Sequence, residues 1–98
     1  MKSPPKRLTD SGNLYSIEMV ERITRVSKDR ILVYQRHGII SAISPRGKPR
    51  FDDEAVHKLR RISRLLSEYG VNEKGAVVLS SLLDEVERLR EEIRFLRR

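Results

Sequence analysis

Residues 16–38 read SIEMVERITRVSKDRILVYQRHG, and this run predicts two short helices joined by a tight turn. Ser16 is a candidate N-cap, because its hydroxyl can accept a hydrogen bond from a free amide of the first helical turn. Apolar residues then recur at helical spacing on one face: Ile17, Val20 and Ile23. This periodicity predicts a first helix that extends to Thr24.

The second helix is expected from Lys28 to about Arg36, with Ser27 as its N-cap. Its buried residues are expected to be Ile31 and Tyr34, with Leu32 as a further candidate. Gly38 stands where many helices end in a left-handed residue, a conformation that glycine adopts without steric cost. Two short helices in this arrangement form a helix-turn-helix.

The segment after this motif resembles a wing. Residues 39–43 are apolar and partly β-branched, which predicts a short strand, and residues 44–49 have the composition of a turn. Residues 50–51 then return toward the core. Because Pro45 and Pro49 cannot donate backbone hydrogen bonds, we expect a small two-stranded ribbon at most.

Two further helices are expected. Asp52 caps the first of them, and acidic residues fill its first turn, where the helix dipole favours negative charge. Its apolar stripe is Val56, Leu59, Ile62, Leu65 and Leu66. Tyr69-Gly70 ends this helix, and Asn72 is a plausible cap for the last one. Residues 73–98 contain no proline, so one helix or two nearly continuous helices should fill them.

The last helix carries the clearest periodic signal in the sequence. Its apolar residues follow one another at alternating steps of three and four: Leu79, Leu82, Val86, Leu89, Ile93 and Leu96. A sustained stripe of this kind is typical of a coiled-coil seam. The alternative, packing on the chain's own domain, fits the beginning of the stripe better than its end. We therefore expect a homodimer whose contact is formed by Leu82, Val86, Leu89, Ile93 and Leu96.

The charge of the chain favours an anionic partner. The 98 residues are enough for one compact domain, 36% of them are charged, and the net charge is +7 at pH 7. Such an excess of positive charge favours nucleic acid, an acidic protein or an anionic membrane surface, and the alternative is a role in solubility alone.

The positive charge is concentrated in the helix-turn-helix and the wing. Asp29 is the only acidic residue between Arg22 and Arg50. The basic residues of that segment are Arg22, Arg25, Lys28, Arg30, Arg36, Arg46, Lys48 and Arg50. This distribution is typical of a protein that neutralises phosphates with one part of its surface. A second basic cluster is open to two interpretations, a further phosphate contact or a solvated face: Lys58, Arg60, Arg61 and Arg64.

Several classes of function find no support. The chain has no cysteine, which excludes disulfides and thiolate metal sites and is compatible with a cytoplasmic location. It has neither an apolar stretch long enough to cross a membrane nor a signal peptide. His37 and His57 stand far apart without a catalytic arrangement, and a helix start explains the acidic run at residues 52–54. The five glycines are scattered and form no phosphate-binding loop. We therefore expect no enzyme activity, cofactor or metal ion.

Several motifs together resemble the MerR-type winged helix-turn-helix. They are Tyr15-Ser16-Ile17, Val26-Ser27, the run from Tyr34 to Ile40, and the run from Phe51 to Val56 that leads into Leu59–Ile62. The resemblance covers about residues 14–80, and its most specific part is the Tyr-x-Arg-x-Gly-hydrophobic segment. It implies a mostly α fold, a MerR-type winged helix-turn-helix with a C-terminal coiled-coil dimerisation helix.

Two short branches of this superfamily end soon after the winged domain. One comprises HspR-like repressors, and the other comprises CbpM-like chaperone modulators, which act on a J-domain co-chaperone. The chain resembles both branches in Gly70-Val71-Asn72, in Gly75 and in the run from Leu82 to Val86.

The chain also departs from the DNA-binding members. These usually carry a Thr-Leu-Arg-Tyr-Tyr run in the second helix, whereas the matching run here has Leu32 at the position of the arginine. Asp29 replaces a common arginine, Arg25 replaces the turn glycine, and the usual wing arginine aligns nearer Pro49. These departures favour the chaperone-modulator branch, whereas the basic charge favours DNA. Arg30 is the candidate to supply the lost charge.

The expected organisation is a flexible arm over residues 1–13, a winged helix-turn-helix domain over 14–72 and a dimerisation helix over 73–98. The expected function is that of a small dimeric MerR-like regulator of transcription that binds double-stranded DNA. The alternative is a CbpM-like chaperone modulator that binds a J-domain co-chaperone. The residues expected to contact DNA are Lys28, Arg30, Arg36, Arg46, Lys48 and Arg50.

Overall fold

The computed structural model describes residues 13–43 and 47–97. Within these ranges the elements follow in the order β1 (Tyr15–Ser16), α2 (Ile17–Thr24), α3 (Lys28–Arg36), β2 (Arg50–Phe51), α4 (Asp53–Glu68) and α5 (Glu73–Leu96). The predicted flexible arm lies outside the described residues except for its last residue, Asn13. The predicted mostly α fold is confirmed, and residues 73–96 form one continuous helix.

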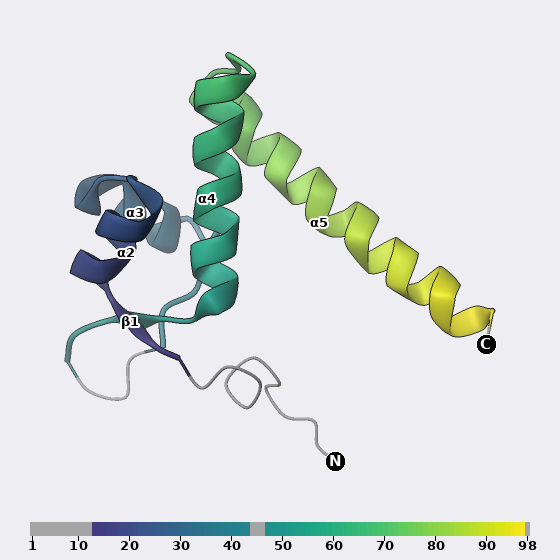
Figure 1. Ribbon diagram of the computed structural model, residues 1–98, viewed down its shortest axis with the longest axis horizontal. Helices are drawn as coiled ribbons and strands as arrows, with labels where there is room; N and C mark the ends of the chain where they lie inside the picture. Colours follow the sequence, from purple (N-terminus) through teal and green to yellow (C-terminus); the bar gives the residue numbers. More distant parts are fainter. Residues whose placement is uncertain (1–12, 44–46, 98) are drawn as a thin grey trace.

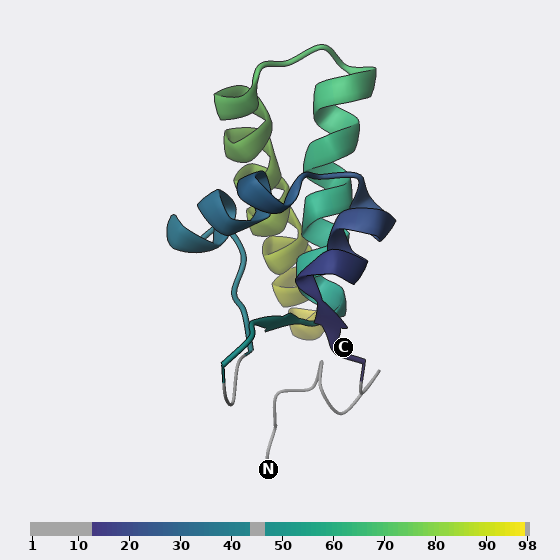
Figure 2. The ribbon, with the colours of Figure 1, turned by 90° about the vertical axis from the view of Figure 1, so that its left-hand side faces the viewer.

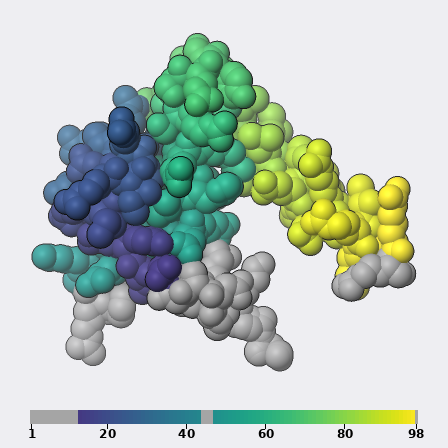
Figure 3. All heavy atoms as spheres, viewed as in Figure 1, coloured from purple at the N-terminus to yellow at the C-terminus, as the bar shows by residue number. Residues whose placement is uncertain are grey.

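The helices are arranged around α4. In Figure 1, α2 and α3 lie on one side of α4, and α5 leaves its end on the other side. Figure 2 shows α2 in front of α4 and α3 beside it, nearer to α5. Helix α2 packs on both α3 and α4, and α4 packs on α5. The C-terminal half of α5 stands clear of the body of the molecule (Figure 3).

The helix starts are decided locally, as predicted. Each predicted N-cap side chain accepts a hydrogen bond from the backbone N–H three residues on, which satisfies a donor that the helix itself leaves free. The four caps are Ser16 to Met19 at 3.2 Å, Ser27 to Arg30 at 3.3 Å, Asp52 to Ala55 at 3.0 Å and Asn72 to Gly75 at 2.8 Å. The helix that begins at Lys28 ends at Arg36, and Gly38 adopts a left-handed φ of 77°.

The core forms where α2, α3 and α4 meet β2. Its most deeply buried side chains are Val20, Ile31, Tyr34, Phe51, Leu59 and Ile62. The prediction that Leu32 is buried is wrong, because the side of α3 that packs inward carries Ile31 and Tyr34, and Leu32 is exposed. In α2 the predicted apolar face is buried at Ile17 and Val20, whereas Ile23 is exposed.

The predicted wing ribbon is reduced to one bridge, and its second strand gains a further partner that the sequence analysis did not predict. Among the described residues, 39–43 contribute a single antiparallel bridge, from Ile43 to Arg50. Strand β2 also pairs with β1, which places Tyr15 opposite Phe51 and Ser16 opposite Arg50. The two prolines explain the short ribbon, since neither can donate to a ladder. The pairing with β1 ties the end of the wing to the start of α2.

The turn between α2 and α3 contains a strained residue. Arg25 has a φ of 63°, and among the described residues it is the one non-glycine residue with a positive φ. Its N–H caps α2 by donating to the carbonyl oxygen of Glu21 at 2.8 Å. A left-handed conformation costs an L-residue about 1 kcal/mol, and glycine avoids this cost.

We therefore expect Arg25→Gly to be more stable than Arg25→Ala by about 1 kcal/mol, because both variants lose the same charge and only alanine keeps the strain. Urea denaturation of the two variants measures the difference. An alanine variant as stable as the glycine variant would show that the turn relaxes.

Candidate nucleic-acid interface

Helix α3 presents a solvent-exposed face along its whole length. Lys28, Leu32 and Arg36 follow one another at intervals of four residues and are all exposed. Residues at this spacing lie on one side of a helix. Ile31 and Tyr34 on the other side anchor α3 in the core. The outward face of α3 therefore carries a cation at each end and an apolar side chain between them.

Lys28 of α3 pairs with a carboxylate of α2, and the positive charge of Lys48 in the wing acts on the same group. Lys28 Nζ lies 3.4 Å from Glu18 Oε2 in the first turn of α2. A hydrogen bond from the backbone N–H of Glu18, the hydrogen bond from Lys28, and the positive charges of Lys28 and Lys48 together lower the pKa of Glu18. The pair between Lys28 and Glu18 is a contact that sequence reasoning missed, and it links α3 to the first turn of α2.

Arg50 in β2 lies beside the start of α2. Its backbone pairs with Ser16, the N-cap of α2, and its own residue is exposed. We define the reading surface as Lys28, Arg36, Lys48 and Arg50, the exposed described cations of α3 and the wing other than Arg30, which pairs with Glu73. Arg46, also predicted to contact DNA, lies outside the described residues.

Arg30 makes a different contact from the one that the sequence suggested. Its guanidinium pairs with the carboxylate of Glu73 in the first turn of α5, and the hydroxyl of Tyr34 donates to the same carboxylate at 3.0 Å. The hydrogen bonds from Arg30 and Tyr34 lower the pKa of Glu73, whereas burial and the bond to Glu73 raise the pKa of Tyr34. Arg30 thus links α3 to α5, although its side chain remains 47% exposed.

The basic cluster of α4 is divided between two tasks. Lys58 and Arg61 make ion pairs with Asp84 of α5, and Arg64 pairs with Glu68 of its own helix at 3.6 Å. Arg60 is exposed and lines a shallow groove between α2 and α4 together with Ile23 and His57. Two of the four residues, Lys58 and Arg61, therefore hold α4 and α5 together.

The predicted association stripe of α5 is exposed in the single chain. Leu82, Val86, Leu89, Ile93 and Leu96 are between 42% and 78% exposed. Among the described residues of α5, only Ala76 and Ser80 are buried, and both lie in its first half. The stripe is thus an apolar face that the chain itself leaves uncovered.

Comparison with known protein families identifies the family of this chain. The family described as MerR HTH family regulatory protein matches residues 15–98, from β1 through α5. The chain belongs to the MerR family. Among curated proteins no relative matches it.

Membership of the MerR family accounts for the architecture around the reading surface. The match includes the helix-turn-helix, the wing and the projecting α5, so the long helix is part of the family's regulatory unit. The matched family consists of regulatory proteins with a helix-turn-helix. The helix-turn-helix is a motif with which transcription regulators bind DNA. Within the described residues, no helix is both long and apolar enough to cross a membrane.

Proposed function

We propose that this MerR-family chain is a dimeric regulator of transcription that inserts α3 into the major groove of DNA and lays its wing on the adjacent backbone. The observation that carries the proposal is the outward face of α3, on which Lys28, Leu32 and Arg36 are all exposed. In helix-turn-helix proteins the N-terminal residues of the recognition helix contact base edges, and flanking cations contact phosphates. The exposed side of Leu32 suits contact with a thymine methyl group.

The dimer is proposed from the exposed stripe on α5. An apolar face of this length is stabilised when a second copy of the chain covers it. A two-fold contact between identical stripes forms a closed dimer and does not lead to larger assemblies. Two copies of α3 then face two half-sites of a DNA duplex. Dimerisation thereby doubles the contacts that the small reading surface makes alone.

A J-domain co-chaperone remains the alternative partner, and the acidic residues that would receive it are partly engaged. J-domains generally present a basic helix, so a modulator needs acidic surface. Asp52 is 7% exposed and caps α4, Asp53 accepts a hydrogen bond from the Tyr15 hydroxyl at 2.7 Å, and Asp84 is paired with Lys58 and Arg61. These contacts favour DNA over the J-domain protein.

Salt dependence of duplex binding tests the DNA proposal. Lys48→Gln is expected to weaken binding by a similar factor for all sequences and to reduce the salt slope by about one ion, since a phosphate contact is lost. Glu18→Gln is expected to strengthen binding, because it removes a carboxylate that pairs with Lys28 and competes with phosphate for it. Fluorescence anisotropy with labelled duplexes over a range of salt concentrations measures both effects.

Matched controls separate these effects from net charge. Arg94→Gln and Glu91→Gln make the same charge changes in an exposed pair on α5, and we expect them to alter binding little. Absence of duplex binding by the wild-type chain at low salt, where the electrostatic attraction is strongest, would contradict the DNA proposal. Heat of binding to a J-domain protein in calorimetry would then support the alternative.

A further inference from the structure

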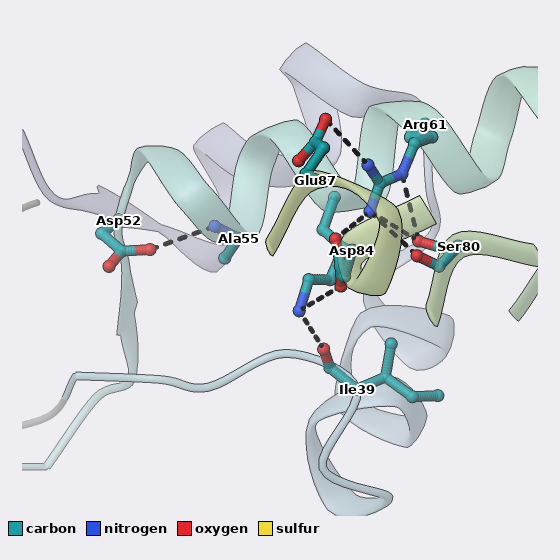
Figure 4. A network of polar contacts seen from close by, with 8 residues as sticks. Ile39, Asp52, Ala55, Arg61, Ser80, Asp84 and Glu87 are labelled. Carbon is teal, nitrogen blue, oxygen red and sulfur yellow. Dashed lines mark hydrogen bonds and ion pairs between the residues drawn. The ribbon is translucent and has the colours of Figure 1, made fainter. Parts of the chain in front are cut away.

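A partly buried polar cluster joins α5 to the winged domain. Arg61 of α4 donates from Nε to the hydroxyl of Ser80 at 3.2 Å and from Nη2 to the Ser80 carbonyl oxygen at 3.2 Å. The same Nη2 pairs with Oδ1 of Asp84, one turn further along α5. Figure 4 shows the guanidinium of Arg61 directed at Ser80 and Asp84. We define the clamp as Lys58, Arg61, Ser80 and Asp84.

Lys58 extends the clamp to a third element. Its Nζ lies 3.3 Å from Oδ2 of Asp84 and donates to the carbonyl oxygen of Ile39 at 3.2 Å. Ile39 follows α3 and leads toward the wing. One ammonium group therefore connects α4, α5 and the segment between the recognition helix and the wing.

The clamp is more shielded from water than the other ion pairs of α5. Ser80 is 2% exposed, and the side chain of Arg61 is 15% exposed. Partial burial alone would raise the pKa of Asp84, but the hydrogen bond from Arg61 and the charge of Lys58 outweigh it and lower that pKa. The pairs of Arg88 and Arg94, by contrast, are more than half exposed and join α5 only to itself. Shielded charges interact more strongly than exposed ones.

Because of its position, the clamp controls the direction of the C-terminal part of α5. Beyond Ser80, no described residue of the helix is buried, so contacts at the clamp decide the direction in which the association stripe points. At 1.5 Å per residue, Leu96 lies about 18 Å along the helix from Asp84. A tilt of about 10° at the clamp displaces that end by roughly 3 Å, close to the rise of about 3.4 Å per base pair.

We propose that the clamp is the positioning device that sets the distance and angle between the two copies of α3 in the dimer. It thereby selects the spacing of the DNA half-sites that the dimer accepts. This inference rests on the proposed function, since half-sites matter only to a dimer that binds DNA. Lys58 and Asp84 are positioning residues in this scheme, because neither belongs to the reading surface.

A distance measurement tests the clamp without requiring DNA or a dimer. The chain has no cysteine, so Arg22→Cys in α2 and Arg94→Cys in α5 accept spin labels without competing sites. Dilution with unlabelled chain restricts the signal in double electron–electron resonance to distances within one chain. Asp84→Asn is expected to broaden or shift this distance distribution, because the amide keeps the shape but loses the charge that holds Lys58 and Arg61.

Two further variants make the distance measurement specific. Glu85→Gln removes the neighbouring carboxylate, which pairs with Arg88 on the same helix, and is expected to leave the distribution unchanged. Asp84→Glu is expected to restore part of the wild-type distribution by restoring the charge. A distribution that is the same in Asp84→Asn and the wild type would overturn the clamp.

A panel of duplexes with different half-site spacings tests the consequence for DNA. The wild type is expected to prefer one spacing by on the order of tenfold, the size of a 1.4 kcal/mol difference. Asp84→Asn and Lys58→Met are expected to flatten this preference, while circular dichroism and sedimentation show that the fold and the dimer persist. An unchanged preference in both variants would overturn the link to spacing. Lack of duplex binding by the wild type would instead contradict the proposed function, and the distance measurement would still decide the clamp.

Discussion

Leu89→Lys is expected to convert the proposed dimer into a monomer at micromolar concentration. Leu89 lies in the middle of the stripe and is 43% exposed in the single chain, so a partner helix can cover it. In the two-fold dimer the substitution places two ammonium groups in a desolvated seam. Burying an unpaired charge costs several kcal/mol, which is a large share of the association energy of a short coiled coil. Sedimentation equilibrium measures the loss.

Ser81→Lys provides the matched control for this prediction. It introduces the same side chain on the same helix, at an exposed position outside the stripe. We expect Ser81→Lys to remain dimeric and to keep its affinity for a duplex with two half-sites, whereas Leu89→Lys loses most of that affinity. A wild-type chain that sediments as a monomer at micromolar concentration would contradict the dimer.

Phe51→Ala is expected to destabilise the domain by about 3–5 kcal/mol, the usual cost of removing a buried phenylalanine ring. Phe51 is fully buried in β2, pairs with Tyr15 of β1 and directly precedes the cap of α4. Its loss leaves a cavity where the wing, α2 and α4 meet. A domain of this size has a total stability of about 5–15 kcal/mol, so much of the variant should unfold under mild denaturing conditions.

Phe95→Ala separates this effect from the loss of an aromatic ring in general. Phe95 is 67% exposed on α5, and we expect its removal to change the free energy of unfolding by less than about 0.5 kcal/mol. Urea denaturation followed by circular dichroism compares the two variants at one protein concentration. Similar losses in both would contradict the central role of Phe51 in the core.

The helices were predictable from the sequence because their signals are local. A capping side chain such as Ser27 or Asn72 acts on an amide three residues away, and the apolar period appears within one element. The bounds of α3 and the end of α4 near Gly70 were therefore predicted from the sequence. The position of Leu32 was not, because the helical period allows either face to turn inward and only packing in the common core, where Ile31 and Tyr34 are buried, decides between them.

The candidate site was predictable in its composition but not in its arrangement. The sequence pointed to Lys28 and Lys48 as members of one basic segment. The pair between Lys28 and Glu18 became visible only when α2 and α3 were packed together. The partner of Arg30 is Glu73, whose carboxylate also binds Tyr34, a residue 39 positions earlier in the chain. No local sequence pattern predicts a contact between residues so far apart in the chain.

The sequence by itself determined where the helices begin and end and which stripe of α5 is apolar. These properties depend on hydrogen bonds and periodicities within a few residues. Only the tertiary structure decided that β2 pairs with β1, that Arg30 turns to α5, and that Lys58 and Arg61 hold Asp84. These contacts depend on the angles at which separate helices pack, and those angles result from the whole core rather than from any one segment.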